Sequence, residues 1–356
     1  MTASPRRKLT FAFPGALETK TGGYGYDRRV IAGLLELGWD VELLPLGAGF
    51  PFPDEESLTG AERLLSALPD GACVLVDGLA FGVLDAWAAR DAQRLEIIAL
   101  VHHPLALETG LDGNQRRRLE AQEHRALSQV AGVIVTSPMT ARELTENYSV
   151  PASLITVAIP GTDPAPAARN SNAVPRILSI GSLTARKGHD VLLAALKQIE
   201  DLPWSATIVG STAFDPHTSA YLQSLVEELG LQHRVVLTGE VEDATALLAT
   251  ADIFALASRY EGYGMVFAEA LAHGLPIVAC HAGAVPDVVP EDAGLLVAVD
   301  DAGGFAGALR TLLGSPEIRR SYADASRRHG RALPGWDVTA RIIAECLEAQ
   351  FKQRRS

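Results

Sequence analysis

The chain has 356 residues, more than one compact core usually accommodates, so its length predicts two domains of about 150 to 180 residues each. Apolar residues make up 47% of the chain and charged residues 21%, which excludes a disordered or fibrous protein. The net charge of −12 is divided evenly between the two halves, without the basic half or face of a nucleic-acid-binding protein. Nucleic acid is therefore not expected as a partner.

The apolar runs have the length of buried strands and are shorter than the roughly 18 residues that a membrane-spanning helix needs. A soluble protein is therefore expected. The three cysteines, Cys73, Cys280 and Cys346, are far apart and form no C-x-x-C pair, so they suggest neither a disulfide framework nor a zinc site. This use of cysteine favours a reducing cytoplasm. Residues 9–13 are interpreted as a strand, because Pro14 interrupts the apolar segment too early for a signal peptide.

Short apolar runs alternate with segments of helical period along the first half of the chain. This alternation predicts an α/β fold, a doubly wound parallel sheet covered by helices on both faces. A helix is expected over Tyr24–Leu37, closed by Gly38. The expected strands are Leu9–Phe13, Asp40–Leu44, Cys73–Val76, Ile97–Val101, Val133–Val135 and Leu154–Val157.

The stretch 163–175 (DPAPAARNSNAVP) has no apolar period and is predicted to be a linker, after which the pattern begins again. Strands are expected at Arg176–Ile180, Ala206–Val209, Val235–Thr238, Ile253–Ala257, Ile277–Ala279 and Gly294–Val297. Helices are expected at about Val191–Leu196, Ser219–Leu229, Ala244–Ala249, Met265–Ala272 and Gly304–Leu313, with a last amphipathic helix from Trp336 to Phe351.

These patterns give the expected domains: 1–164, a linker at 165–175, 176–334, and a C-terminal helix at 335–356. Both domains are expected to be Rossmann-like and to face each other across a cleft. Ligands of open α/β sheets bind beyond the carboxyl ends of the strands, so the function is predicted to lie between the two halves.

The segment 258–276 (SRYEGYGMVFAEALAHGLP) follows an expected strand and opens a helix. Gly262 and Gly264 would let the backbone approach a ligand. The free N–H groups near Gly264, Met265 and Val266, aided by the helix dipole, would form an anion site that suits a diphosphate.

Two carboxylates flank this predicted anion site. Glu261 precedes the helix and Glu269 lies inside it, and each could accept hydrogen bonds from the hydroxyls of a sugar. The alternative is an ordinary strand-loop-helix turn with two solvated glutamates. The number of coinciding features favours a binding site.

A second segment, 180–190 (IGSLTARKGHD), also lies between a strand and a helix. Its adjacent Arg186 and Lys187 could neutralise a diphosphate. A basic dipeptide in a surface loop is more often simply solvated, so these residues alone are weak support.

The first half offers a glycine turn and two histidines. Gly22 and Gly23 link the first strand to the first helix, without the G-x-G-x-x-G spacing of a dinucleotide site, so a turn whose amides reach a ligand is favoured. His102 and His103 end another strand, which would place an imidazole at the floor of the cleft. One of the two could be structural and the other catalytic.

Together these residues resemble glycosyltransferase family 4, the retaining nucleotide-sugar enzymes of GT-B fold, over nearly the whole chain. The spacing from Glu261 to Glu269 is similar to the E-x7-E motif of that family. The resemblance implies that Glu269 binds the ribose hydroxyls of the donor nucleotide. It also implies that Glu261, with backbone groups around Gly264, Met265 and Val266, holds the transferred sugar and the diphosphate.

The same resemblance assigns further roles. Lys187 would contact the diphosphate, Gly22 and Gly23 would form the glycine loop, and His103 would be the acceptor-side histidine near the anomeric carbon. The last helix would cross back to the N-terminal domain. Many members carry an arginine at the position of Ser182, and Arg186 could supply that missing charge.

The expected reaction is transfer of a hexose from a nucleoside diphosphate, UDP- or GDP-linked, to an acceptor hydroxyl with retention at the anomeric carbon. No D-x-D pair occurs to hold a metal, so metal-independent transfer without a cofactor is predicted. A sugar phosphorylase or a sugar-nucleotide epimerase of the same architecture, and a binding module without catalysis, remain as alternatives. The acceptor is expected to be a small molecule or saccharide, with Asp77-Gly78 and Thr109–Asn114 as candidate contacts by position. No strong membrane-docking signal occurs.

Overall fold

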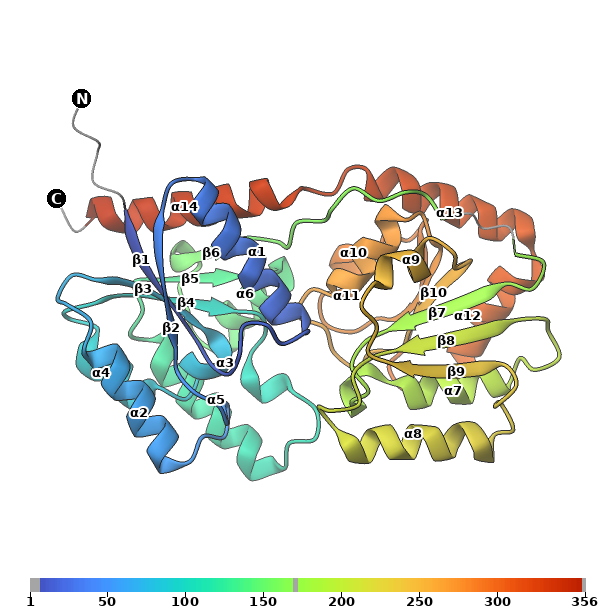
Figure 1. The fold of residues 1–356 in the computed structure, drawn as a ribbon, viewed down its shortest axis with the longest axis horizontal. Coiled ribbons are helices and arrows are strands. Elements are labelled where there is room, and N and C mark those ends of the chain that lie inside the picture. Colours follow the sequence, from blue (N-terminus) through green and yellow to red (C-terminus); the bar gives the residue numbers. More distant parts are fainter. Residues whose placement is uncertain (1–6, 169–171, 354–356) are drawn as a thin grey trace. The chain divides into compact units, whose positions relative to one another are not determined.

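The computed structural model describes residues 7–168 and 172–353, and the chain divides into two compact units (Figure 1). Unit 1 comprises Met1–Gly161 together with Pro334–Ser356, and unit 2 comprises Thr162–Leu333. The divisions fall after residues 161 and 333, whereas the sequence placed them near 164 and 334.

Unit 1 is built on a parallel six-stranded sheet in the order β2-β1-β3-β4-β5-β6. The strand β3 is buried along its whole length, because helices cover both faces of the sheet. The strands are β1 (Lys8–Phe13), β2 (Asp40–Pro45), β3 (Cys73–Asp77), β4 (Glu96–Val101), β5 (Gly132–Val135) and β6 (Ile155–Val157).

The helices of unit 1 form two layers. The apolar core on one face unites side chains from α2 to α5 with alternate residues of the strands, and Figure 1 shows α1 and α14 on the other side of this sheet. The helices are α1 (Gly22–Glu36), α2 (Glu55–Ser66), α3 (Gly78–Phe81), α4 (Asp85–Asp91), α5 (Gly113–Leu127), α6 (Pro138–Asn147) and α14 (Trp336–Gln353), with short 3₁₀ turns η1 (Leu105–Leu107) and η2 (Ala152–Leu154).

The C-terminal helix α14 belongs to unit 1 and packs on α1. A Cβ on Gly33 of α1 would lie only 2.5 Å from the Cβ of Ala340, so the two helices meet at a position where only glycine fits without a shift. The hydroxyl of Thr339 donates to the carbonyl of Ile159 at 2.8 Å. Ile343 and Leu347 of α14 are fully buried within unit 1.

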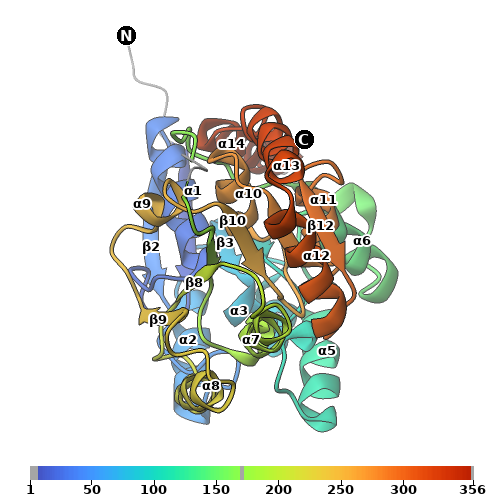
Figure 2. The ribbon, with the colours of Figure 1, turned by 90° about the vertical axis from the view of Figure 1, so that its right-hand side faces the viewer.

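Unit 2 repeats the plan with the parallel order β12-β11-β10-β7-β8-β9. Its main core joins α7, α8 and α12 to one face of the sheet, and Figure 2 shows α10 and α13 on the other side. The strands are β7 (Arg176–Ile180), β8 (Ser205–Val209), β9 (Val235–Gly239), β10 (Ile253–Leu256), β11 (Ile277–Cys280) and β12 (Gly294–Val297). The helices are η3 (Ala185–Lys187), α7 (His189–Lys197), α8 (Pro216–Glu228), α9 (Ala244–Leu248), α10 (Met265–Ala272), α11 (Val285–Val288), α12 (Ala302–Gly314) and α13 (Pro316–Gly330).

The α/β class is confirmed, and each strand expected from the sequence is found with its ends within one residue. Helix starts differ more. The helix α8 begins at Pro216 instead of residue 219, because Asp215 caps it by accepting a hydrogen bond from the amide of Thr218. The helix α13 was not among the expected elements.

The expected linker is tied to unit 2 in its described parts. The amide of Ala168 donates to the carbonyl of His273 at 2.7 Å, and the side chain of Asn172 donates to Asp252 at 2.8 Å. Residues 169–171 of the same stretch lie outside the described residues. A segment without apolar period therefore still docks, through hydrogen bonds that hydropathy does not reveal.

Candidate active site

The helix α10 starts directly after the loop that follows β10. Gly264 is its N-cap residue, with φ of +89°, and no side chain caps the helix there. The residues Gly264, Met265 and Val266 are half-exposed. Their amides therefore stand at a partly open helix N-terminus, the place where a helix binds anions best.

Glu261 lies buried beside the basic loop of unit 2. Its Oε1 accepts hydrogen bonds from Lys187 Nζ at 2.6 Å and from the hydroxyl of Ser258 at 2.6 Å. Arg186 lies 3.4 Å from Oε2 and also donates to the carbonyl of Tyr260 at 3.0 Å. Two motifs that are 74 residues apart in the chain thus form one cluster, which we call the Glu261 cluster: Arg186, Lys187, Ser258 and Glu261.

The charges of this cluster do not cancel. Burial alone would raise the pKa of Glu261, but the charges of Lys187 and Arg186, with the hydrogen bonds from Lys187 and Ser258, outweigh it and lower the pKa to about 2. Glu261 is therefore a carboxylate at neutral pH. Two cations against one anion leave a surplus positive charge, and both cationic side chains retain some exposure, 18% and 13%.

Glycines allow the basic loop to approach the end of β10 closely. Gly188, the N-cap of α7, has φ of +63°, and a Cβ there would lie 1.9 Å from the carbonyl oxygen of Ala257. The stem of Lys187 crosses Gly181, where a Cβ would lie 3.1 Å from it. These contacts place Lys187 beside Glu261 because no side chain stands in the way.

Changing Gly188 to Ala is expected to lower the free energy of unfolding of unit 2 by about 2–4 kcal/mol, from backbone strain and the clash with Ala257. Gly230→Ala is the matched control, because Gly230 also has a positive φ, of +70°, but has no neighbour near its added Cβ. It should cost only about 1–2 kcal/mol. Urea unfolding of the two variants would measure the difference, and equal losses would contradict the close approach.

Two residues that the sequence reasoning did not single out support the same loop. Arg259 donates to Asp190 at 2.7 and 3.0 Å and to Asp300 at 2.8 Å, so its guanidinium connects the loop after β10 with α7. His189 is buried, and its Nε2 lies 3.1 Å from the carbonyl of Gly181. Burial lowers the pKa of His189 to about 4, so it remains neutral and its role is structural.

Glu269 lies on α10, within the segment that begins at Gly264. Burial, followed by the charge of Asp163, raises the pKa of Glu269 to about 7. Within the described residues its carboxylate has no hydrogen-bond or ion-pair partner. A carboxyl group that titrates near neutrality and is not used by the fold suits a ligand that donates hydrogen bonds.

Ser182 lies in the same loop as the two cations and is half-exposed, and its carbonyl accepts the amide of Thr184 at 2.8 Å. The guanidinium that this loop does carry, that of Arg186, donates to the carbonyl of Tyr260 and faces Glu261.

In unit 1, the glycine turn forms the first turn of α1. Thr21 caps this helix by accepting the amide of Tyr24 at 3.3 Å, and Gly22 and Gly23 follow it. A Cβ on Gly23 would lie 3.5 Å from the imidazole of His102, an ordinary contact. The glycine turn and the end of β4 are therefore neighbours.

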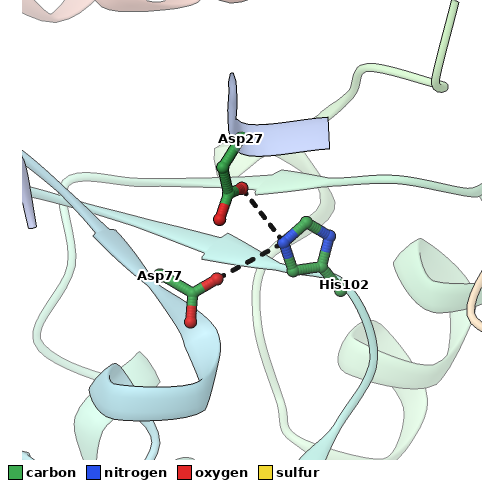
Figure 3. Close-up of side chains that lie close together, drawn as sticks. All are labelled: Asp27, Asp77 and His102. Carbon is green, nitrogen blue, oxygen red and sulfur yellow. Dashed lines mark hydrogen bonds and ion pairs between the residues drawn. The ribbon is translucent and has the colours of Figure 1, made fainter. Parts of the chain in front are cut away.

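His102, rather than His103, enters a cluster of buried carboxylates (Figure 3). Its Nε2 lies 3.2 Å from Asp27 Oδ1 and 3.3 Å from Asp77 Oδ2. We call these three residues the Asp-His-Asp cluster. Asp27 is fully buried on α1, Asp77 ends β3, and Tyr26 contacts the imidazole edge-on at 5.4 Å.

The two carboxylates change the protonation of His102. Burial would lower the pKa of His102, but its hydrogen bonds and charge interactions with Asp27 and Asp77 raise it to about 10. Burial also raises the pKa of Asp27, to about 6. Without a ligand, His102 is therefore an imidazolium at neutral pH, a poor general base.

His103 points to a different partner, with Nε2 3.5 Å from Glu108 Oε2, and its side chain is 23% exposed. The segment 109–114, a candidate acceptor contact, leads into α5, where Asp112 and Gln115 form a capping box. At least part of that segment therefore serves helix capping. Nothing in the sequence distinguished His102 from His103. Asp77 was a candidate acceptor contact by position, whereas Asp27 was not singled out.

Among the residues that the structure describes, no helix is both long and apolar enough to cross a membrane.

Two family profiles match the chain. The profile described as glycosyl transferases group 1 matches residues 174–315, and the one described as glycosyltransferase family 4 matches residues 57–165. The two segments together span more than half of the chain and fall in different units.

Curated relatives are similar over most of the chain. An MMP alpha-(1->4)-mannosyltransferase from Mycolicibacterium hassiacum is 27% identical over 83% of this chain and 75% of its own length. A D-inositol 3-phosphate glycosyltransferase from an Arthrobacter species is 29% identical over 75% of this chain and 68% of its own.

Solved structures share the fold. Sucrose-phosphate synthase from Thermosynechococcus elongatus superposes with a TM-score of 0.83 at 22% identity, covering 98% of this chain and all of that one. HepE from Anabaena in complex with UDP and glucose gives 0.75 at 18% identity, covering 95% and 99%. The two parallel six-stranded sheets are those of the GT-B fold. The chain therefore belongs to glycosyltransferase family 4 and is a hexosyltransferase that uses a nucleotide-sugar donor.

Proposed function

We propose that the protein transfers a hexose from a UDP- or GDP-linked donor to an acceptor hydroxyl with retention of anomeric configuration, and that no metal ion is needed at the diphosphate. The observation that carries the proposal is the surplus positive charge of the Glu261 cluster. The Glu261 cluster and the partly open N-terminus of α10 belong to the same unit.

Charge development in the reaction explains why such a site suits this chemistry. When the bond between the anomeric carbon and the diphosphate oxygen breaks, the electron pair leaves with the diphosphate. Lys187 and Arg186, with the amides near Gly264, Met265 and Val266, would stabilise that negative charge. These groups would do at the diphosphate what a metal ion does in other transferases.

The second half of the reaction needs a proton acceptor. In a retaining transfer the leaving phosphate oxygen takes the proton of the acceptor hydroxyl, while that hydroxyl oxygen bonds to the anomeric carbon on the same face. A strong protein base is then not required. This agrees with the raised pKa of His102, which makes its imidazole a poor proton acceptor while it faces Asp27 and Asp77 alone. His103 would position groups near the anomeric carbon, and Gly22 and Gly23 would bring backbone amides towards the donor.

The remaining roles concern recognition of the donor. Glu269 would accept hydrogen bonds from the ribose hydroxyls, and Glu261 would contact the transferred sugar through the oxygen facing Arg186. The loop with Ser182 would receive its positive charge from Arg186.

The two relatives described above are named as a mannosyltransferase and as a D-inositol 3-phosphate glycosyltransferase. A further relative, from Corynebacterium glutamicum, is named as a GDP-mannose-dependent mannosyltransferase of a monoacylated phosphatidylinositol monomannoside. A small polyhydroxylated molecule or a saccharide is the acceptor class that we propose, in agreement with the inositol phosphate named for one of these relatives. The cytoplasmic location stays a prediction.

A donor panel tests the proposal. UDP- and GDP-hexoses should be screened by thermal shift, because a ligand that binds only the folded protein raises its melting temperature. Without an acceptor, the protein should hydrolyse the donor that binds only slowly. A polyol or saccharide acceptor should increase the rate of donor turnover. EDTA should not reduce the rate of transfer. The anomeric configuration of the product is read by NMR.

Other outcomes would identify a different enzyme. Turnover that requires inorganic phosphate in place of a nucleotide would indicate a phosphorylase. Conversion of the nucleotide sugar into its epimer without an acceptor would indicate an epimerase. Inversion of configuration, or complete loss of transfer in EDTA that added magnesium restores, would overturn the proposed mechanism.

A further inference from the structure

We propose that Asp27, Asp77 and His102 of unit 1 bind a divalent transition-metal ion of the zinc class, through one imidazole nitrogen and the two carboxylates. The three residues come from α1, the end of β3 and the start of the loop after β4, and their ligand atoms lie within 4.8 Å of one another (Figure 3). Because β3 and β4 are adjacent parallel strands, their carboxyl ends bring Asp77 and His102 to one point.

The spacing of the atoms suits a metal ion. Charge-assisted hydrogen bonds between an imidazolium and a carboxylate usually measure about 2.7–2.9 Å. Here the two Nε2 to oxygen distances are 3.2 and 3.3 Å. Ligand atoms bound at about 2.0–2.1 Å to one tetrahedral zinc ion lie roughly 3.3 Å from each other.

A second observation is the unsatisfied oxygen of Asp27. This residue has no exposed surface, and among the described residues its Oδ2 has no hydrogen-bond partner. An unpartnered carboxylate oxygen is costly inside a protein. Nearby polar groups are engaged elsewhere, since the hydroxyl of Tyr24 donates to Pro14 and the guanidinium of Arg28 donates to Thr19 and Leu17.

The charge balance points the same way. A divalent ion offsets the charge of two carboxylate ligands, so that a site with one neutral imidazole carries no net charge.

The donor set selects the kind of ion. Magnesium and calcium prefer oxygen ligands alone, whereas an imidazole with two carboxylates suits zinc, manganese or iron. Three protein ligands leave one tetrahedral position for water or a hydroxyl. His102 retains 21% exposure, so the cluster is reachable from solvent. These ligands are not residues proposed to hold the diphosphate, so the ion would not replace Lys187 or Arg186.

The test uses the whole 356-residue chain after treatment with a chelator. Zinc is titrated in competition with a chromophoric chelator, and bound zinc per chain is measured by mass spectrometry after gel filtration. We expect one zinc per chain. Asp27→Asn and His102→Gln should each lower the affinity by at least about 100-fold, more than the loss of a supporting contact around a ligand.

Two histidine variants serve as matched controls. His103→Gln removes the adjacent imidazole, and His329→Gln removes an imidazole that is 2.8 Å from Asp292 on the surface of unit 2. Both should keep the zinc. X-ray absorption of the zinc-loaded wild-type protein should show one nitrogen ligand on the zinc, with oxygen as its other ligands. Because this measurement uses the wild-type protein, it tests the proposal even if a cluster variant fails to fold.

Wild-type protein that takes up no more zinc than the Asp27→Asn/His102→Gln double variant would overturn the site, and His102 would then be only an imidazolium held by two carboxylates. Zinc ligated by sulfur or by several histidines would also overturn it. These readouts do not depend on catalysis, so they stand or fail separately from the proposed transferase mechanism.

Discussion

Lys187→Met is expected to lower kcat by about 10²–10³-fold, the usual cost of removing one donor that stabilises developing negative charge. Methionine keeps the length of the side chain but removes its charge, so Glu261 keeps the charge of Arg186 and the hydrogen bond from Ser258. The surplus positive charge of the Glu261 cluster is then lost. Steady-state kinetics with the donor identified by thermal shift would measure the change.

Breaking a buried ion pair can also destabilise the fold, by about 3–5 kcal/mol. Thermal unfolding of Lys187→Met therefore accompanies the kinetics, which are run well below its melting temperature. Lys187→Arg keeps the charge and should recover part of the activity. Lys197→Met is the matched control, because Lys197 forms an equally short but exposed pair with Glu200, at 2.6 Å. A folded Lys187→Met protein with full turnover would refute the assignment of the diphosphate site.

The sheets could be predicted because their signal is local. Buried parallel strands such as β3 and β4 are continuous apolar runs, and polar or glycine-containing stretches end them. The helix α10 was equally visible, since a glycine N-cap precedes a short apolar segment. In contrast, α13 carries six charged residues among its 15 and buries only small ones, Ala323, Ala325 and Ser326, so it shows no large apolar period.

The contacts of the site depend on the fold. The sequence placed Glu261 and Lys187 in two separate segments that each lie between a strand and a helix. Their 2.6 Å contact spans 74 residues, however, and depends on the pairing of β7 with β10 in the sheet. The Asp-His-Asp cluster was missed for the same reason. Asp27, Asp77 and His102 follow no common motif, and only the adjacency of β1, β3 and β4 brings them together. Local patterns do not report such long-range adjacency.

Glu269→Gln is expected to raise the KM for the donor about 10-fold or more near pH 8, because it removes a charged acceptor of hydrogen bonds worth roughly 1.5–3 kcal/mol. The pKa of Glu269 is raised to about 7, first by burial and then by Asp163. Below that pH the wild-type carboxyl is protonated. The donor KM of the wild-type protein should therefore increase as the pH falls from about 8 to about 6, and Glu269→Gln should remove that increase.

Asp163→Asn gives the sharper control for this pH dependence. Removing the charge of Asp163 lowers the pKa of Glu269, so the rise in KM should move to lower pH while the KM near pH 8 stays the same. If the pH dependence came instead from the nucleotide or from His102, Asp163→Asn would leave its position unchanged. The direction of this shift thus separates a carboxylate that binds the ribose from a buried glutamate that only supports α10.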